Sequence, residues 1–215
     1  MTCDVISSGS RGNAVFVDGI LLDCGVSFKK LTPYLIKIKL VLLTHEHKDH
    51  FNESTIRQLA ALRPTVRFGC CEWLGTALIA AGVPSKRIDI YKPNEVYRYD
   101  AANITVSAFE LLHDVPNCGY KFTIGSEKGF YATDTGNLND IDAKGYDLYL
   151  IEANHGEQEI RKRMNAKIAD GKFSYEVRAM AGHLSKEQAD AFLIKNAEPQ
   201  SKFCYLHQHQ EMEGM

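Results

Sequence analysis

The sequence predicts an α/β protein, and three observations support that prediction. Short apolar runs alternate along the chain with segments whose apolar residues recur at helical spacing. Several of these runs end directly in His or Asp, as buried strands do when they deliver polar side chains at the edge of a sheet. The length of 215 residues, with 45% hydrophobic residues, suits one domain or two fused half-domains that share a core.

The first half of the chain alternates between predicted strands and helices. The strands are expected at 4–6, 14–17, 20–23, 40–43 and 66–69, and the helices at 29–39, 53–62 and 72–81. Asp18-Gly19 predicts a tight hairpin between the second and third strands. Gly82 and Pro84 end the last of these helices.

The second half follows the same pattern. Strands are expected at 104–109, 120–124, 129–132, 147–152 and 203–206. The strands at 120–124 and 129–132 are predicted to pair as a hairpin. A helix is expected to begin after Ser185, because Gln188 three residues later completes a capping box.

The stretch Thr44-His45-Glu46-His47-Lys48-Asp49-His50 follows the apolar run 40–43 and carries the strongest chemical signal. Imidazole nitrogens and carboxylate oxygens are ligands of zinc and its first-row neighbours. Ligands this close together do not all fit one ion, but two adjacent ions can divide them. His45 and His47 would bind one ion, and Asp49 and His50 the other.

His113 and Asp134 each lie just past a predicted strand, as the first cluster does. A lone strand-end histidine is more often structural, and Asp134-Thr135-Gly136 alone is often a turn. From the residues alone, a structural role and metal ligation both stay open for His113 and Asp134.

Two further regions have both a structural and a functional interpretation. The loop 7–13 is either a flexible turn or an anion-binding loop that uses Ser8, Ser10 and Asn13. The basic stretch 161–178, with Arg161 and Arg178, is either a solvated helix face or a local patch that binds a polyanion. Asp23 would either orient a ligating histidine or cap the next helix.

Composition limits the possible partners and locations. The formal net charge of −2 gives no overall attraction to nucleic acid or membranes, so such binding needs a local patch. No apolar run approaches the ~20 residues that span a bilayer, and no secretory signal is expected at the N-terminus. The six cysteines are scattered, which favours free thiols in a reducing cytoplasm over a disulfide framework.

The motif T-H-x-H-x-D-H after an apolar strand resembles the signature of the metallo-β-lactamase-fold hydrolases. The segments SSGSRGN, LLDCG, LLHDVPNCGYKF, ATDTG, IEANH and GHLS occur in an order similar to the small YycJ/WalJ-type branch of that superfamily. The branch is associated with nuclease-type hydrolysis of DNA and is related more distantly to ribonuclease Z. The chain departs from the branch after the first motif, at Phe51-Asn52-Glu53, and after the last, at Gln208-His209.

The resemblance implies an αββα four-layer sandwich, in which residues 1–215 form one domain of two halves, roughly 1–110 and 111–215. It implies two divalent ions, and the histidine-rich ligand set favours Zn²⁺ over Mn²⁺. One ion would be held by His45, His47 and His113, the other by Asp49, His50 and His207, with Asp134 as the bridge. His209 is an alternative to His207, which is preferred because it directly follows the last strand.

The same resemblance implies a phosphodiesterase or nuclease, DNA being favoured over RNA and the action exonuclease-like. A hydroxide shared by the two ions, with its pKa lowered towards ~7, would attack phosphorus. Asp49 would take the proton of the water, and His183 would stabilise charge or protonate the leaving oxygen. An RNA-processing phosphodiesterase, a thioester or lactone hydrolase, and a non-catalytic binding protein are the alternatives. Nothing in the sequence indicates the oligomeric state.

Overall fold

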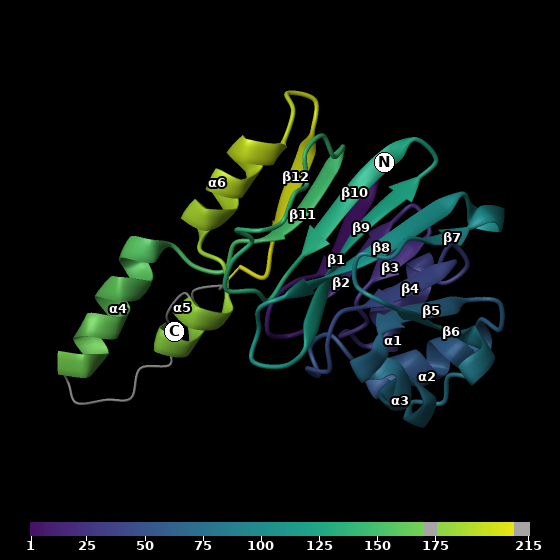
Figure 1. Ribbon diagram of the computed structural model, residues 1–215. Coiled ribbons are helices and arrows are strands. Elements are labelled where there is room, and N and C mark those ends of the chain that lie inside the picture. Colours follow the sequence, from purple (N-terminus) through teal and green to yellow (C-terminus); the bar gives the residue numbers. More distant parts are fainter. Residues whose placement is uncertain (170–175, 209–215) are drawn as a thin grey trace.

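The computed structural model describes residues 1–169 and 176–208, which form two six-stranded sheets with helices outside them (Figure 1). The first sheet contains β1 (Cys3–Ser7), β2 (Ala14–Val17), β3 (Ile20–Leu22), β4 (Leu40–Leu43), β5 (Arg67–Cys71) and β6 (Ile88–Tyr91), in that order. The second contains β12 (Lys202–Leu206), β11 (Leu148–Glu152), β10 (Glu127–Ala132), β9 (Asn117–Ile124), β8 (Ile104–Leu111) and β7 (Tyr97–Tyr99).

Six α-helices are assigned within the described residues. They are α1 (Phe28–Leu31), α2 (Glu53–Leu62), α3 (Glu72–Ala80), α4 (Glu157–Ala169), α5 (Glu176–Gly182) and α6 (Lys186–Asn196). None of these helices is long and apolar enough to cross a membrane.

Three apolar clusters separate four layers. Leu59 of α2 and Leu74 of α3 pack with Val41 on the outer face of the first sheet. Leu42 faces the opposite side, in the cluster between the two sheets. On the outer face of the second sheet, Phe192 of α6 packs with the strands. The αββα sandwich is therefore confirmed, and the continuous apolar run of β4 follows from burial on both of its faces.

Parallel pairing brings the metal-ligand candidates to one edge of the sandwich. β3 and β4 are parallel, as are β10, β11 and β12. β8 runs in the direction of β10, because each is antiparallel to β9. The carboxyl ends of these strands therefore share an edge, and the residues that follow them can meet there.

Most predicted elements are confirmed, with two differences. The helix expected at 29–39 is only α1, which gives way to a 3₁₀ turn at Thr32–Tyr34, because Pro33 has no N–H with which to continue the α-helix. β6 and β7 are absent from the prediction, since they are short, half-exposed strands at the far edges of their sheets. The hairpin at Asp18-Gly19 and the capping box of Ser185 and Gln188 are confirmed.

Candidate metal centre

The first group of ligand candidates is a set of three imidazoles, His45 and His47 after β4 and His113 after β8. One donor atom from each lies within 4.8 Å of the others. Nδ1 of His113 lies 3.2 Å from the carbonyl oxygen of Gly182, to which it can donate. Nε2 of His45 and Nε2 of His113 are buried and have no hydrogen-bond partner among the described residues. Oδ1 of Asp114 lies 3.1 Å from Nε2 of His113, as an ion pair. Buried imidazole nitrogens that make no hydrogen bond and converge in this way fit a divalent cation.

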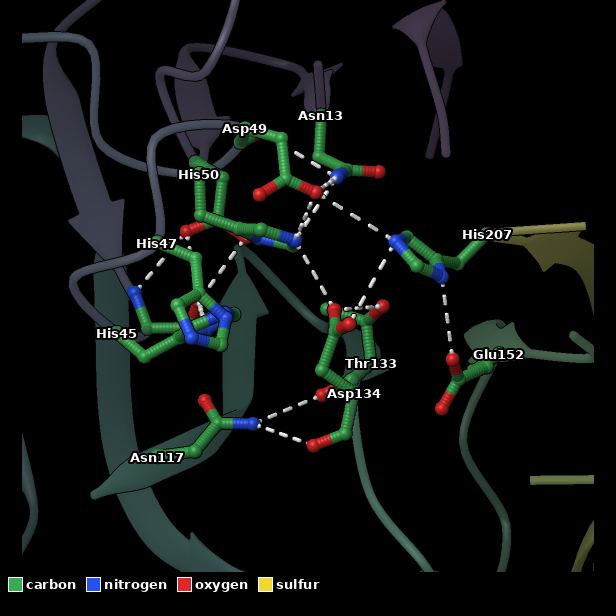
Figure 2. A network of polar contacts seen from close by, with 12 residues as sticks. Asn13, His45, His47, Asp49, His50, Asn117, Thr133, Asp134, Glu152 and His207 are labelled. Atoms are coloured by element: carbon green, nitrogen blue, oxygen red, sulfur yellow. Dashed lines mark hydrogen bonds and ion pairs between the residues drawn. The ribbon is translucent and has the colours of Figure 1, made fainter. Parts of the chain in front are cut away.

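The second group is Asp49, His50 and His207, whose donor atoms also lie within 4.8 Å of one another (Figure 2). Oδ2 of Asp49 lies 3.6 Å from Nε2 of His50 and 3.7 Å from Nε2 of His207. His50 is fully buried, and Nε2 of His207 is another buried nitrogen without a hydrogen bond. This mixed nitrogen and oxygen set fits a second cation.

Asp134 lies between the two groups. Its Oδ2 is 3.0 Å from Nε2 of His50, and its Oδ1 is 3.5 Å from Nε2 of His207. It also belongs to a cluster with His45 and His50 whose donor atoms lie within 4.8 Å. Asn117 at the start of β9 donates its Nδ2 to the carbonyl oxygens of Thr133 and Asp134, at 3.0 and 2.7 Å, and so holds this turn. Asp134 can therefore reach ions in both groups.

Asp23 orients a ligand candidate and does not cap a helix. Its Oδ2 lies 2.7 Å from Nδ1 of His50, and it also accepts from the hydroxyl of Tyr131 at 2.7 Å and the amide of Thr44 at 3.0 Å. The N-cap of α1 is Ser27 instead. A carboxylate on Nδ1 fixes the tautomer of His50 and leaves Nε2 free for a cation.

Glu152 at the end of β11 is a functional candidate that the sequence analysis missed. This fully buried carboxylate lies 2.6 Å from Nδ1 of His183 and 3.3 Å from Nδ1 of His207. It also accepts the amides of Thr135 and Leu184, at 3.1 and 3.2 Å. The sequence contains a signal for this residue, because Glu152 ends an apolar strand and the other site residues follow such strands.

The backbone is in the left-handed region at three site residues. The φ angles are +57° for Asp23, +56° for Asp134 and +50° for His207. Each residue lies just past the end of a strand. L-residues adopt this conformation at a cost, and they retain it where the surrounding structure holds the side chain in a required direction.

Two of the three predicted substrate residues near the N-terminus contact ligand candidates of the metal centre. Oγ of Ser8 accepts the N–H of His207 at 2.6 Å. Nδ2 of Asn13 lies 2.8 Å from Nε2 of His50 and 3.3 Å from Oδ2 of Asp49. Ser10 is exposed. Ser8 and Asn13 therefore position ligand candidates, and a role in substrate binding stays a prediction for all three residues.

The predicted basic residues lie on two helices. Arg178 of α5 is exposed, with Nη2 3.9 Å from Oδ2 of Asp114, beside His113 and His183. Arg161 is exposed on α4, which stands away from both sheets (Figure 1). Residues 170–175 of the basic stretch, and His209, lie outside the described residues.

Mutual electrostatics keep the carboxylates ionised. Burial raises the pKa of Asp134, but the charges of His50 and His207 outweigh burial and hold it well below its ordinary value. Burial lowers the pKa of His50, but Asp134 and Asp23 raise it well above 6.5. Burial, with His50 as the next cause, lowers the pKa of His45 to about 2. The metal-free centre thus combines ionised carboxylates and a neutral His45 with a protonated His50, and a cation that binds there would displace the proton of His50.

The fold and this centre together define a metal-dependent hydrolase of the metallo-β-lactamase fold. A model of the β-lactamase superfamily domain matches residues 19–205, and the chain belongs to that superfamily.

Among its relatives is exodeoxyribonuclease YycJ of Bacillus anthracis, which is 24% identical over 221 residues, covering 94% of this chain and 80% of the relative. The metallo-β-lactamase fold protein YhfI from Bacillus subtilis superposes with a TM-score of 0.70 at 17% identity, over 96% of this chain and 85% of YhfI. The short form of human tRNase Z gives a TM-score of 0.64 at 15% identity, over 98% of this chain and 94% of that one.

Proposed function

We propose that the protein is a phosphodiesterase with two divalent ions, most simply Zn²⁺, that hydrolyses nucleic acid, preferentially DNA and from an end. The observation that carries the proposal is the pairing of His183 with Glu152. His183 and Glu152 also form a possible ligand group with Asp134 and His207, whose donor atoms lie within 4.8 Å of one another. The two three-residue ligand groups are complete without His183, whose ring lies 5.4 Å from that of His113 and stacks on that of His207 at 5.2 Å. A titratable side chain held at the edge of the metal centre is suited to proton transfer to a leaving oxygen.

The environment of His183 favours its protonated form. Burial lowers the pKa of His183, but the hydrogen bond and the charge of Glu152 outweigh burial and raise the pKa above 6.5. Because Nδ1 donates to Glu152, Nε2 is the atom available to a substrate. His183 can therefore donate a proton to an alkoxide leaving group near neutral pH.

Asp49 is suited to the opposite role. Burial raises its pKa, but the ion pair with His207 at 3.7 Å and the charge of His50 lower it below its ordinary value. Asp49 is thus ionised and can accept a proton from the attacking water. Two divalent ions bound by the ligand groups would supply a water of lowered pKa and would stabilise charge on the phosphoryl oxygens.

The similarity to exodeoxyribonuclease YycJ supports DNA as the substrate. RNA is the second candidate, supported by the similarity to tRNase Z over nearly the whole chain. The described cysteines are all free thiols, which supports a reducing cytoplasm as the location.

The first test is hydrolysis of bis-p-nitrophenyl phosphate with Zn²⁺ and with Mn²⁺. Wild type should turn over, and Asp49→Ala should lose about 10²-fold or more in kcat on this substrate. His183→Ala should lose about 10²-fold on an oligonucleotide, whose alkoxide leaving group needs a proton, and less on this diester, whose phenolate leaves without one. His183→Ala should retain both ions, which metal analysis checks. Wild type with full metal occupancy and no turnover would refute the phosphodiesterase and point to thioesters or lactones. Single-stranded DNA and RNA of one sequence then distinguish the two polymers.

A charge-reversal variant tests the basic stretch on α4. Arg161→Glu with Arg163→Glu should weaken oligonucleotide binding and leave turnover of the small diester nearly unchanged, because phosphate contacts there would lie away from the reacting bond. Arg98→Glu, at an exposed position on β7, is the matched control. Equal losses on both substrates would contradict a remote binding patch.

A further inference from the structure

A pocket of about 410 Å³ opens beside the metal centre, between the residues that follow β8 and helix α5. His113 and His183 form the side of the pocket that faces the centre, with their rings 5.4 Å apart at an interplanar angle of 68°. One of these residues is a ligand candidate and the other is the proposed proton donor. A group that enters the pocket therefore lies next to the reacting bond.

The walls of the pocket are apolar and its rim is charged. Leu112, an exposed residue, lines the pocket, and Ala179 and Ala181 contribute only methyl groups. At the rim, the guanidinium of Arg178 lies 3.9 Å from the carboxylate of Asp114, and both side chains are largely exposed. Apolar faces with polar groups at the edge suit a flat heteroaromatic ring, and Arg178 can stack on such a ring or contact a neighbouring phosphate.

The pocket is preformed, because α5 is fixed to the loops of the metal centre. The carbonyl oxygen of Gly182 contacts Nδ1 of His113 at 3.2 Å, and the amide of Gly136 donates to the carbonyl oxygen of Leu112 at 2.9 Å. A Cβ on Gly136 would lie 2.3 Å from the carbonyl oxygen of Ala181, so only glycine permits this close approach. The wall of the pocket and the ligand His113 therefore form one rigid unit.

We infer that this pocket binds one unpaired nucleobase, that of the nucleotide next to the scissile phosphate. The inference rests on the proposed function and names the feature of the substrate that the site recognises. A volume of this size suits one small organic group and not a base pair. A base inside a duplex would have to leave its stack to enter, so a frayed or single-stranded end is the favoured substrate.

The test compares single-stranded oligonucleotides that carry either a normal nucleoside or an abasic tetrahydrofuran residue at each end in turn. Wild type should cleave the normal end about tenfold faster than the abasic end, as expected from stacking of one base. The Ala181→Leu variant fills the pocket at a position where the alanine is exposed. Ala181→Leu should therefore lose the preference for the normal end, because its cleavage of that end alone becomes slower. Ala80→Leu, at an exposed position of α3, is the matched control and should keep the preference.

A second measurement does not depend on turnover. Terminal 2-aminopurine should change its fluorescence on binding to wild type and to Ala80→Leu, but not on binding to Ala181→Leu. Equal cleavage of normal and abasic ends by wild type, with turnover intact, would overturn the base pocket alone. Absence of turnover on every phosphodiester, with both ions bound, would overturn the proposed function and the pocket with it.

Discussion

Replacement of Gly25 by alanine should disrupt half of the metal centre and leave the other half intact. A Cβ at this position would lie 1.7 Å from the carbonyl oxygen of Asp49 and 2.1 Å from its carbonyl carbon. Asn13 holds both segments, because its carbonyl accepts the amide of Gly25 at 2.9 Å and its amide donates to the carbonyl of Asp49 at 2.6 Å. To restore a van der Waals separation, the backbone of Asp49 must retreat by about 1.5 Å.

The expected effect on the two ligand groups is unequal. Ligand distances tolerate deviations of only about 0.2 Å, so the group that contains Asp49 and His50 should lose about 100-fold or more in affinity for its ion. The group of His45, His47 and His113 should keep its ion. Overpacking should also destabilise the fold by about 1–3 kcal/mol, which lowers Tm by roughly 2–12 °C in a chain of this length.

Calorimetric titration of the metal-free protein with Zn²⁺, together with thermal unfolding, measures both effects. Gly156→Ala is the control, because its Cβ would meet nothing closer than Oε1 of Glu187 at 3.9 Å. Gly25→Ala should bind one ion tightly where the control binds two. Two tight sites and an unchanged Tm in Gly25→Ala would refute the reasoning.

Three further predictions concern the carboxylates and histidines around the centre. Asp23→Asn should weaken metal binding about 10–100-fold, because His50 loses the carboxylate that contacts its Nδ1. Competition with a chelator measures the metal affinity, and an affinity equal to that of the wild type would contradict the prediction. Burial lowers the pKa of His207, but the carboxylates of Asp134 and Asp49 raise it from 6.5 to about 10. Its contribution to the stability of the metal-free protein is therefore complete below about pH 6.5 and is lost as the pH rises towards 10. Urea unfolding at pH 6 and pH 9 should show a smaller difference for His207→Asn than for wild type, and equal differences would contradict the assignment. Glu152→Gln should lower kcat by about 10²-fold, and it should shift the alkaline limb of the pH profile of kcat to lower pH. The reason is that His183 loses the charged partner that raises its pKa. An alkaline limb that does not shift would mean that Glu152 has a structural role only.

The sequence predicted which side chains the fold brings together, because few residue types can bind a metal ion, and their role as ligands stays a prediction. His45, His47 and His113 had to be ligand-type side chains at strand ends, and the αββα fold places those ends together. Glu152 gave a weaker signal, because one carboxylate at the end of an apolar strand has no characteristic spacing.

A loop facing the centre was one of two alternatives for residues 7–13, because the sequence does not determine the direction of a loop side chain. Asn13 faces His50 because Gly25 and Asp49 pack against its backbone, and these residues lie far from it in sequence. The division into one domain of two halves, and the roles of the site residues, stay predictions. The helix expected at 29–39 is wrong for a local reason, because the apolar spacing around Pro33 is helical but proline lacks the N–H that an α-helix needs there.

The contact between Ser8 and His207 joins residues that are 199 positions apart, and it has a consequence for the order in which the centre forms. During synthesis His113 is made 94 residues before His207, which at about 5–20 residues per second is a delay of roughly 5–20 s. A nascent chain can therefore assemble His45, His47 and His113 while the other ion has no complete set of ligands. Loading of the two ions would be sequential in a newly made molecule, and the second would arrive only after β12 has joined its sheet.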